Sequence, residues 1–185
     1  LLINDPQSFE RAESIREKGT NRSRFFRGQV DKYTWVDLGS SYLPSDILAA
    51  VLLAQLEARA EIQKNRKQVW EYYTQQLQSW AFKNQVQLPF VPGDCEQTYH
   101  MFYMILPSLA ARQALMEKLR ENGVVSVFHY LPLHLSEMGK KFGGQEGDCP
   151  ITETISDRLL RLPLYNSLKP ELQDLVVETI LQFSP

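Results

Sequence analysis

The sequence lacks most of the features that readily reveal a function. Its 185 residues include only two cysteines, Cys95 and Cys149, which lie far apart and fit no metal-binding spacing. We therefore expect free thiols, as in the reducing cytoplasm. The chain contains no GxSxG, Walker, GxGxxG or CxxC motif, so the signatures of nucleophile-elbow hydrolases, P-loop proteins, dinucleotide-binding folds and dithiol enzymes are absent.

Strong charge and long hydrophobic runs are absent as well. The formal net charge is −2, which offers no electrostatic basis for binding nucleic acid or an anionic membrane. No apolar run approaches the roughly 20 residues that a membrane-spanning helix needs. The composition therefore predicts neither nucleic acid nor membrane as a partner.

The chain does not begin with methionine, and its first residues, Leu1-Leu2-Ile3, form a short apolar run. This run is too short for the apolar part of a signal peptide and is more typical of the end of a buried strand. We expect the natural chain to begin earlier. Asp5 and Pro6 predict the start of a helix that continues to about Lys18 and stops at Gly19.

A stretch from Ser45 to about Trp80 has no glycine or proline and shows helical spacing of apolar residues. Its first half is nearly all apolar and is expected to be buried, whereas the part from Glu61 onward is amphipathic. A single helix of this length, about 50 Å at 1.5 Å per residue, exceeds a small domain. We expect it, or two helices joined at a bend, to connect two domains; the lack of a sustained heptad disfavours a coiled coil.

The C-terminal half alternates strand and helix signals, which is typical of an α/β or α+β layer domain. The predicted elements are a buried strand over Thr98–Leu106, a helix from Ser108 to Gly123, a strand over Val124–Phe128, a loop over 135–150, a helix over Thr152–Leu160 and a helix from Pro170.

The segment from Gly19 to Asp46 is polar, basic and rich in aromatic residues, without clear periodicity. Guanidinium groups match phosphate oxygens, and aromatic rings can stack on a base or sugar. The alternative is a charged surface loop anchored by its aromatic residues. The side chains concerned are Arg22, Arg24, Arg27, Lys32, Phe25, Phe26, Tyr33 and Trp35.

Two further segments could bind a ligand. Residues 39–46 place serine hydroxyls before a helix N-terminus, which suits an anion, although simple capping by Ser45 explains them too. His129, Tyr130 and His134 follow a strand in a proline-restrained loop. Their spacing does not suit a metal, since Pro132 intervenes and no acidic residue is adjacent. His100 is expected to be a hydrogen-bonded core histidine.

Together these segments resemble the sugar-nucleotide aminotransferases of the DegT/DnrJ/StrS type. The resemblance covers nearly the whole chain and is carried by EKGTNRSRFFRGQVDKYTWVDLGSSYLPSD, AQLE, HMFY, VFHYLPLH and RLLRLPLY. It implies the C-terminal part of an aspartate aminotransferase-like protein (PLP fold type I) that forms a homodimer. Residues 1–58 would be the tail of the large PLP-binding domain, and 59–185 the linking helix and the small domain.

The resemblance also implies a reaction, in which pyridoxal 5'-phosphate (PLP) acts as electron sink. An amino group would pass from glutamate to the 4-keto group of dTDP-4-dehydro-6-deoxy-glucose, for a cell-surface polysaccharide such as enterobacterial common antigen. The alternative is a truncated, non-catalytic module that binds a nucleotide or serves oligomerisation. A family subset has histidine in place of the Schiff-base lysine and performs dehydration, but the resemblance to transaminases is closer.

The residue roles that follow from the resemblance are limited. The Schiff-base lysine would lie upstream of Leu1, so we expect no catalytic residue in this chain and no activity of the chain alone. Ser41 occupies the position of an asparagine that reaches the cofactor phosphate of the partner subunit, while Leu43 stands where many members have arginine. The predicted substrate-binding residues are Arg22, Arg27, Lys32, Tyr33, His129 and Tyr130.

Overall fold

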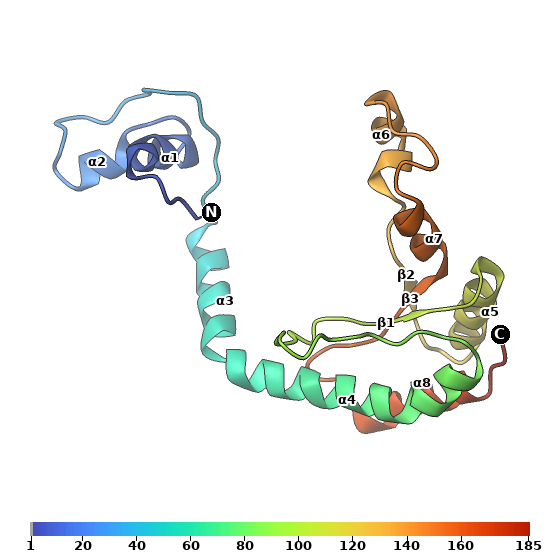
Figure 1. The fold of residues 1–185 in the computed structure, drawn as a ribbon. Coiled ribbons are helices and arrows are strands. Elements are labelled where there is room, and N and C mark those ends of the chain that lie inside the picture. Colours follow the sequence, from blue (N-terminus) through green and yellow to red (C-terminus); the bar gives the residue numbers. More distant parts are fainter. Residues whose placement is uncertain (1) are drawn as a thin grey trace. The chain divides into compact units, whose positions relative to one another are not determined.

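The computed structural model describes residues 2–185 (Figure 1). Its internal contacts divide the chain into two units, of which the first ends at Glu57 and the second is Ala58–Pro185. The domain boundary predicted from the sequence, between residues 58 and 59, lies one residue beyond this division.

The first helical segment forms as its capping residues predict. Asp5 accepts the backbone N–H of Gln7 at 3.0 Å and starts the 3₁₀ turn η1 (Pro6–Ser8), which leads into α1 (Phe9–Arg16). The helix ends two residues before the predicted Lys18. Gly19 has φ +75°, and a Cβ there would lie 1.8 Å from the carbonyl oxygen of Asp37, so only glycine fits this stop.

The strand predicted at the start of the chain is wrong for the part that the structure describes. Leu1 lies outside the described residues, and residues 2–5 have no regular structure, with Leu2 96% exposed. A strand needs a hydrogen-bonded neighbour, and no pairing among residues 2–185 involves this segment.

The basic, aromatic loop is ordered by a short helix and two isolated backbone bridges. Helix α2 (Arg22–Phe26) lies within it, and Glu17 pairs with Ser41 while Thr20 pairs with Trp35. These bridges bring the two ends of the loop together. The loop leads into α3 (Asp46–Glu57), whose first turn is capped by Ser45: its hydroxyl accepts the backbone N–H of Leu48 at 3.3 Å.

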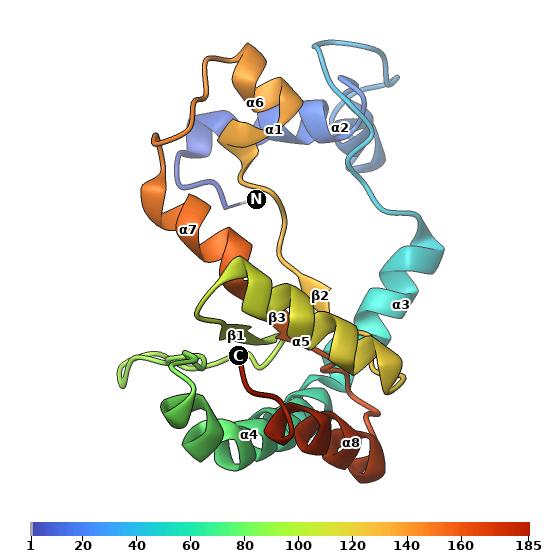
Figure 2. The ribbon, with the colours of Figure 1, turned by 90° about the vertical axis from the view of Figure 1, so that its right-hand side faces the viewer.

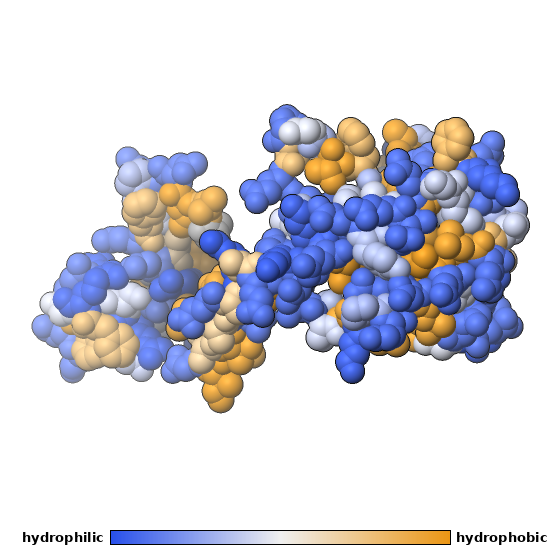
Figure 3. Space-filling view, turned by 90° about the horizontal axis from the view of Figure 1, so that it is seen from below, coloured by the Kyte–Doolittle hydropathy of each residue, from blue (hydrophilic) through white to orange (hydrophobic). Residues whose placement is uncertain are grey.

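Helix α3 corrects the prediction that the first half of the long helical stretch is buried. None of its residues is buried; Ile47 is 77% exposed and Leu52 56% exposed, and Figure 3 shows hydrophobic residues at the molecular surface. An apolar helix is buried only where another surface covers it, and no part of the first unit covers α3. The stretch itself is two helices, because Ala58 separates α3 from α4 (Arg59–Lys83).

The second unit has one hydrophobic core between a small sheet and three helices, α4, α5 (Leu109–Glu121) and α8 (Pro170–Leu181). Figure 2 shows α4 and α8 side by side, as their contacts require. Ser108 caps α5 by accepting the N–H of Ala111 at 3.1 Å. The largest fully buried side chains are Tyr73, Phe102, Leu77, Met104, Leu106, Leu115, Leu119, Leu160 and Ile180.

The sheet is antiparallel, with the order β1-β3-β2. Its strands are β1 (Phe102–Ile105), β2 (Val127–Phe128) and the central β3 (Leu159–Leu162). Burial alternates along β1 and β3, so one sheet face packs on the helices and the other does not. The second unit is therefore an α+β layer structure, as the fold class predicted.

Several details of the second unit differ from the prediction. The strand expected over 98–106 is shorter and is buried on one face only, and His100 precedes it as an exposed residue with its ring Nδ1 3.1 Å from the hydroxyl of Thr98. The predicted loop over 135–150 contains α6 (Glu137–Lys141), preceded by the 3₁₀ turn η2 (Leu133–Leu135). The helix expected over 152–160 is α7 (Pro150–Arg158), and the sequence reading missed β3.

Candidate functional site

The first unit contains a cavity of about 340 Å³ that brings together three of the predicted site residues, Arg22, Tyr33 and Ser41. We call it the loop cavity, because it is built from the end of α1 and from the basic loop, including α2. It also contains Phe26, one of the aromatic residues that the sequence suggested for stacking. Its other charged lining residues, which the sequence did not single out for a site, are Arg16, Glu17 and Lys18.

The loop cavity carries more positive than negative charge. Glu17 is its one acidic lining residue, and its carboxylate already accepts the backbone N–H and the hydroxyl of Ser23, at 3.1 and 2.9 Å. Arg16 lies 3.5 Å from this carboxylate. Arg22 has its guanidinium carbon 5.1 Å from the ring centre of Phe26 and takes part in none of the ion pairs described for residues 2–185. Guanidinium and ammonium groups beside aromatic rings suit a ligand with phosphate oxygens and a planar ring.

Two predicted residues of the loop lie outside this cavity. Arg27 forms a bidentate ion pair with Glu13, with N–O distances of 2.9 and 2.7 Å, and this contact lowers the pKa of the Glu13 carboxyl. Lys32 is exposed and does not line the loop cavity. The structure thus separates Arg27 and Lys32 from Arg22, Tyr33 and Ser41.

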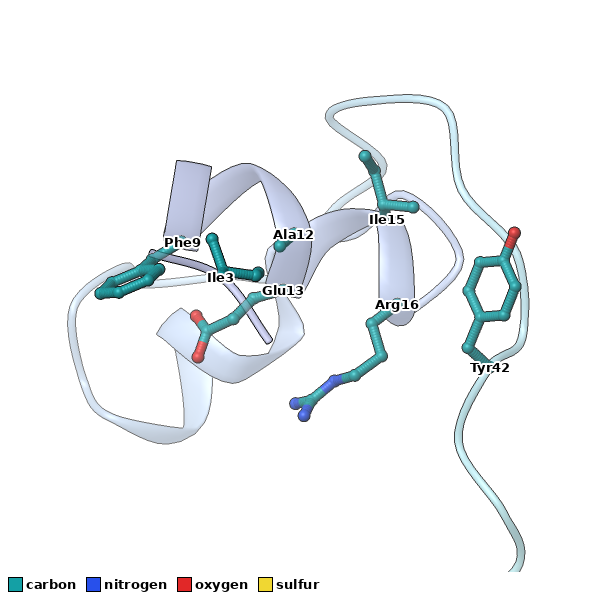
Figure 4. Close-up of a pocket in the computed structure, with 7 residues that line it drawn as sticks. All are labelled: Ile3, Phe9, Ala12, Glu13, Ile15, Arg16 and Tyr42. Atoms are coloured by element: carbon teal, nitrogen blue, oxygen red, sulfur yellow. The ribbon is translucent and has the colours of Figure 1, made fainter. Parts of the chain in front are cut away.

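A larger groove of about 870 Å³ runs along α1 (Figure 4). Helix α1 contributes most of its lining, and Tyr42 comes from the extended segment before α3. The apolar lining residues are Ile3, Phe9, Ala12, Ile15 and Tyr42, joined by Glu13 and Arg16. With mainly apolar side chains and few polar groups, this groove offers a packing surface rather than a set of chemical groups.

In the second unit, His129 lines a cavity of about 450 Å³ beside β2 and the end of β3. We call it the sheet cavity. His100 and Arg161 line it too, whereas its remaining lining residues are apolar: Met101, Val125, Val127, Leu162, Pro163 and Leu164. The Nδ1 atom of His129 is buried without a hydrogen-bond partner.

Tyr130 lies beside the sheet cavity and is 74% exposed. Its ring centre is 5.5 Å from that of His129 and 5.7 Å from the guanidinium carbon of Arg161. The structure therefore brings the predicted pair His129 and Tyr130 together and adds Arg161, which the sequence reading did not select. The signal that could have found Arg161 is a lone cation within the apolar run LLRL.

His134, from the same histidine-containing segment, has a structural partner instead. Its Nε2 lies 2.7 Å from Oε1 of Glu153, whose carboxylate also accepts the backbone N–H groups of Gly147 and Cys149, the latter at 3.2 Å. The pKa of Glu153 is held below its usual value, mainly by the hydrogen bond with His134 and to a smaller extent by the backbone N–H of Gly147. The contact between His134 and Glu153 joins η2 to the first turn of α7.

Among residues 2–185, no group of three or more histidine, cysteine, aspartate or glutamate side chains is placed to hold a metal ion. Within the same range, no helix has both the length and the apolar character for crossing a membrane.

Comparison with known proteins decides the family. The model of the DegT/DnrJ/EryC1/StrS aminotransferase family matches residues 1–181. The chain belongs to this family. The DegT/DnrJ/StrS resemblance that the loop and histidine segments carried is thereby confirmed.

Individual DegT/DnrJ/EryC1/StrS-type relatives are distant but match along the chain. A pleiotropic regulatory protein of Geobacillus stearothermophilus is 27% identical over 99% of this chain and 46% of its own. A dTDP-3-amino-3,4,6-trideoxy-alpha-D-glucose transaminase of Micromonospora megalomicea is 24% identical over 88% of this chain and 43% of its own.

A solved structure of this type shows the same fold. The putative sugar aminotransferase Spr1654 of Streptococcus pneumoniae, in its PLP form, matches with a TM-score of 0.79 at 21% identity. The match covers 96% of this chain and 43% of Spr1654. The chain thus spans less than half of the length of these relatives, and its fold is that of the C-terminal part of a PLP-type aminotransferase, as predicted.

The cofactor predicted from the resemblance, PLP, is the cofactor of this family. The loop cavity fits the phosphate end of such a group. Arg16, Lys18 and Arg22 supply positive charge at its wall. The hydroxyl of Ser41 takes part in no hydrogen bond among residues 2–185, so it is available to a phosphate.

Proposed function

We propose that this chain forms the substrate-facing C-terminal part of a PLP-dependent sugar-nucleotide aminotransferase. The observation that carries the proposal is the loop cavity, in which cations and aromatic rings surround a space suited to phosphate and a ring, in a chain of this family. When bound, PLP supplies the electron sink for amino transfer.

The residues of this chain then bind and orient the substrate. Arg22 and Tyr33 contact the nucleotide in the partner subunit's site. The Ser41 hydroxyl donates to the phosphate of the PLP bound in the partner subunit. Arg27 and Lys32, although outside the loop cavity, remain proposed contacts of the nucleotide when the parent dimer forms. His129 and Tyr130 contact the sugar-nucleotide from the small domain.

The substrate that we propose is dTDP-4-dehydro-6-deoxy-glucose, aminated at its 4-keto group with glutamate as donor. The transaminase of Micromonospora megalomicea, whose name includes a dTDP-amino sugar, supports a dTDP-sugar as the substrate class. The product would serve a cell-surface polysaccharide such as enterobacterial common antigen, and the enzyme would act in the cytoplasm.

We propose that the parent protein is a homodimer. The exposed apolar side chains of α3 support this assembly, because such a surface is normally covered by protein.

The proposal is tested with the full-length parent protein. We expect it to bind PLP, to show the cofactor's absorbance near the visible edge, and to transfer the amino group of glutamate to the dTDP-ketosugar. A parent without bound PLP and without product would refute the proposal. The 185-residue chain alone is expected to be inactive, and product formed by it with added PLP would show that expectation to be wrong.

The alternative is a non-catalytic nucleotide-binding or oligomerisation module. It is favoured by one observation, that the loop cavity is complete within the first unit. Calorimetric titration of the 185-residue chain with dTDP separates the two. Tight binding by a monomer favours the module, whereas weak binding by the monomer favours a site that needs the parent dimer.

A further inference from the structure

Arg161 occupies an unusual position, the middle of the central strand of the sheet. It pairs with Tyr103 of β1 on one side and with Val127 of β2 on the other. Its neighbours along β3, Leu160 and Leu162, are 0% and 5% exposed and belong to the core. Because side chains alternate along a strand, Arg161 lies on the opposite face, where it lines the sheet cavity.

The charge of Arg161 has no counter-charge among the residues that the structure describes. It takes part in none of the ion pairs described for residues 2–185, and no acidic residue lines the sheet cavity. Arg161 is only partly exposed, and its Nε is buried without a hydrogen-bond partner. A cation in such surroundings loses favourable interactions with water, and no carboxylate replaces them. The arrangement therefore costs free energy unless a ligand supplies the missing hydrogen-bond acceptor.

The guanidinium is nevertheless held in one orientation. Its Nη2 donates to the carbonyl oxygen of Phe128 at 3.0 Å, and its carbon lies 5.7 Å from the ring centre of Tyr130. These contacts are made to the two residues on either side of His129. Arg161 and His129 are therefore fixed relative to each other before any ligand binds, which lowers the cost of binding one.

His100 and His129 add two imidazole rings to the same cavity. The buried Nδ1 of His129 is a second polar atom to which no residue of the described part of the chain hydrogen-bonds. Three nitrogen-bearing side chains within an otherwise apolar cavity favour a ligand that brings acceptor oxygens with negative charge.

We propose that Arg161, His100 and His129 form an oxyanion-binding subsite in the small domain. Its ligand group is either a phosphate of the nucleotide-sugar or a carboxylate of the amino donor, both of which present paired oxygens to a guanidinium. The identity of these two ligands rests on the proposed function, which the subsite makes more specific. The binding of an anion to the subsite requires neither the cofactor nor turnover.

The test is proton NMR of the histidine rings in the 185-residue chain during titration with dTDP, pyrophosphate or L-glutamate. The chain has three histidines, and His134, engaged with Glu153, serves as an internal reference. We expect saturable shifts of His100 and His129 but not of His134. Shifts with dTDP and pyrophosphate assign the phosphate, and shifts with glutamate assign the carboxylate. No saturable shift with any probe, or equal shifts of all three rings, would overturn the proposal.

Variants connect the binding to Arg161. Arg161→Gln should weaken the binding that the shifts report by about tenfold, and Arg161→Lys, which keeps the charge but loses the planar fork, should be intermediate. Arg120→Gln, at an exposed residue of α5 outside the cavity, is the matched control. The melting temperature verifies folding of each variant.

A purely structural role of Arg161 predicts a different outcome. Arg161→Gln would then change the His129 resonance in the ligand-free chain but leave the anion affinity equal to that of the unmodified chain. These two results together would overturn the proposal. Failure of the parent's transaminase assay together with intact anion binding would refute the proposed function and leave this subsite standing.

Discussion

The imidazole Nε2 of His134 and the carboxylate Oε1 of Glu153 lie 2.7 Å apart and join two segments that are 19 residues apart in sequence. The same carboxylate accepts two backbone N–H groups, from Gly147 and Cys149. One side chain thereby holds the glycine-rich connection between α6 and α7.

The first prediction concerns the pH dependence of this contact. The folded-state pKa of Glu153 lies below its usual value of 4.5, so its contribution to the free energy of unfolding is complete above about pH 4.5 and is lost as the pH falls through the folded-state pKa. Amide hydrogen exchange at Gly147 and Cys149, measured relative to the intrinsic exchange rate at each pH, should accelerate in that window. Glu153→Gln should accelerate it already at pH 7, whereas Glu137→Gln, at an exposed residue of α6, should not.

The second prediction concerns the core of the second unit. Leu77 of α4 is fully buried, and Leu77→Ala should lower the free energy of unfolding by about 2–5 kcal/mol, because it leaves a cavity among close-packed side chains. Leu133→Ala, at a residue that is 85% exposed, is the control and should change it by less than about 0.5 kcal/mol. Urea denaturation measures both; equal effects would contradict the packing described.

The third prediction concerns α3. Since Leu52 is 56% exposed, Leu52→Asp should change the free energy of unfolding of the 185-residue chain by less than about 0.5 kcal/mol. In the parent protein the same change should disrupt folding or the proposed dimer, because a carboxylate would then be placed in a covered apolar surface. Thermal unfolding and sedimentation check both. A parent with unchanged melting and unchanged oligomeric state would show that α3 is not an interface.

The fourth prediction compares two arginines of the basic loop. Arg22→Gln should weaken dTDP binding by the full-length protein about tenfold, since Arg22 lines the loop cavity without an ion-pair partner. Arg27→Gln, the comparison variant, should weaken dTDP binding less than Arg22→Gln, because the guanidinium of Arg27 is already engaged by Glu13. Titration calorimetry gives both affinities. An equal loss in the two variants would instead support the nucleotide contact predicted for Arg27.

The fifth prediction separates substrate from cofactor. In the full-length protein, His129→Ala should raise the dissociation constant of the sugar-nucleotide while leaving PLP retention unchanged, because His129 belongs to the sheet cavity and not to the loop cavity. Absorbance of the bound cofactor and nucleotide titration check the two quantities separately. Loss of PLP with normal sugar-nucleotide binding would show that the role given to His129 is wrong.

Local sequence signals predicted the elements that local interactions stabilise. The caps at Asp5 and Ser108 and the glycine stop at Gly19 placed helix ends to within a few residues. The break at Ala58 was not predictable at a single residue, since alanine is the strongest helix former. Strand β3 was also missed: four residues carry little periodicity, and the strand exists through its pairing with β1 and β2.

The candidate site divides in the same way. Arg22, Tyr33 and Ser41 were predicted from the composition of the loop and the family resemblance, and the structure brings them to one cavity. Composition could not show that Glu13 engages Arg27, because that ion pair depends on how α1 and the loop fold together.

The sequence by itself determined the family, the α+β character of the small domain, the helix boundaries set by caps and glycines, and the residue types available for binding phosphate. Only the tertiary structure decided which of those side chains share a cavity, that His134 is held by Glu153, and that Arg161 lies beside His129 without a counter-charge. The reason is physical: propensity and capping act over a few residues, whereas burial, ion pairing and cavity lining depend on strands and loops that meet only in the folded chain.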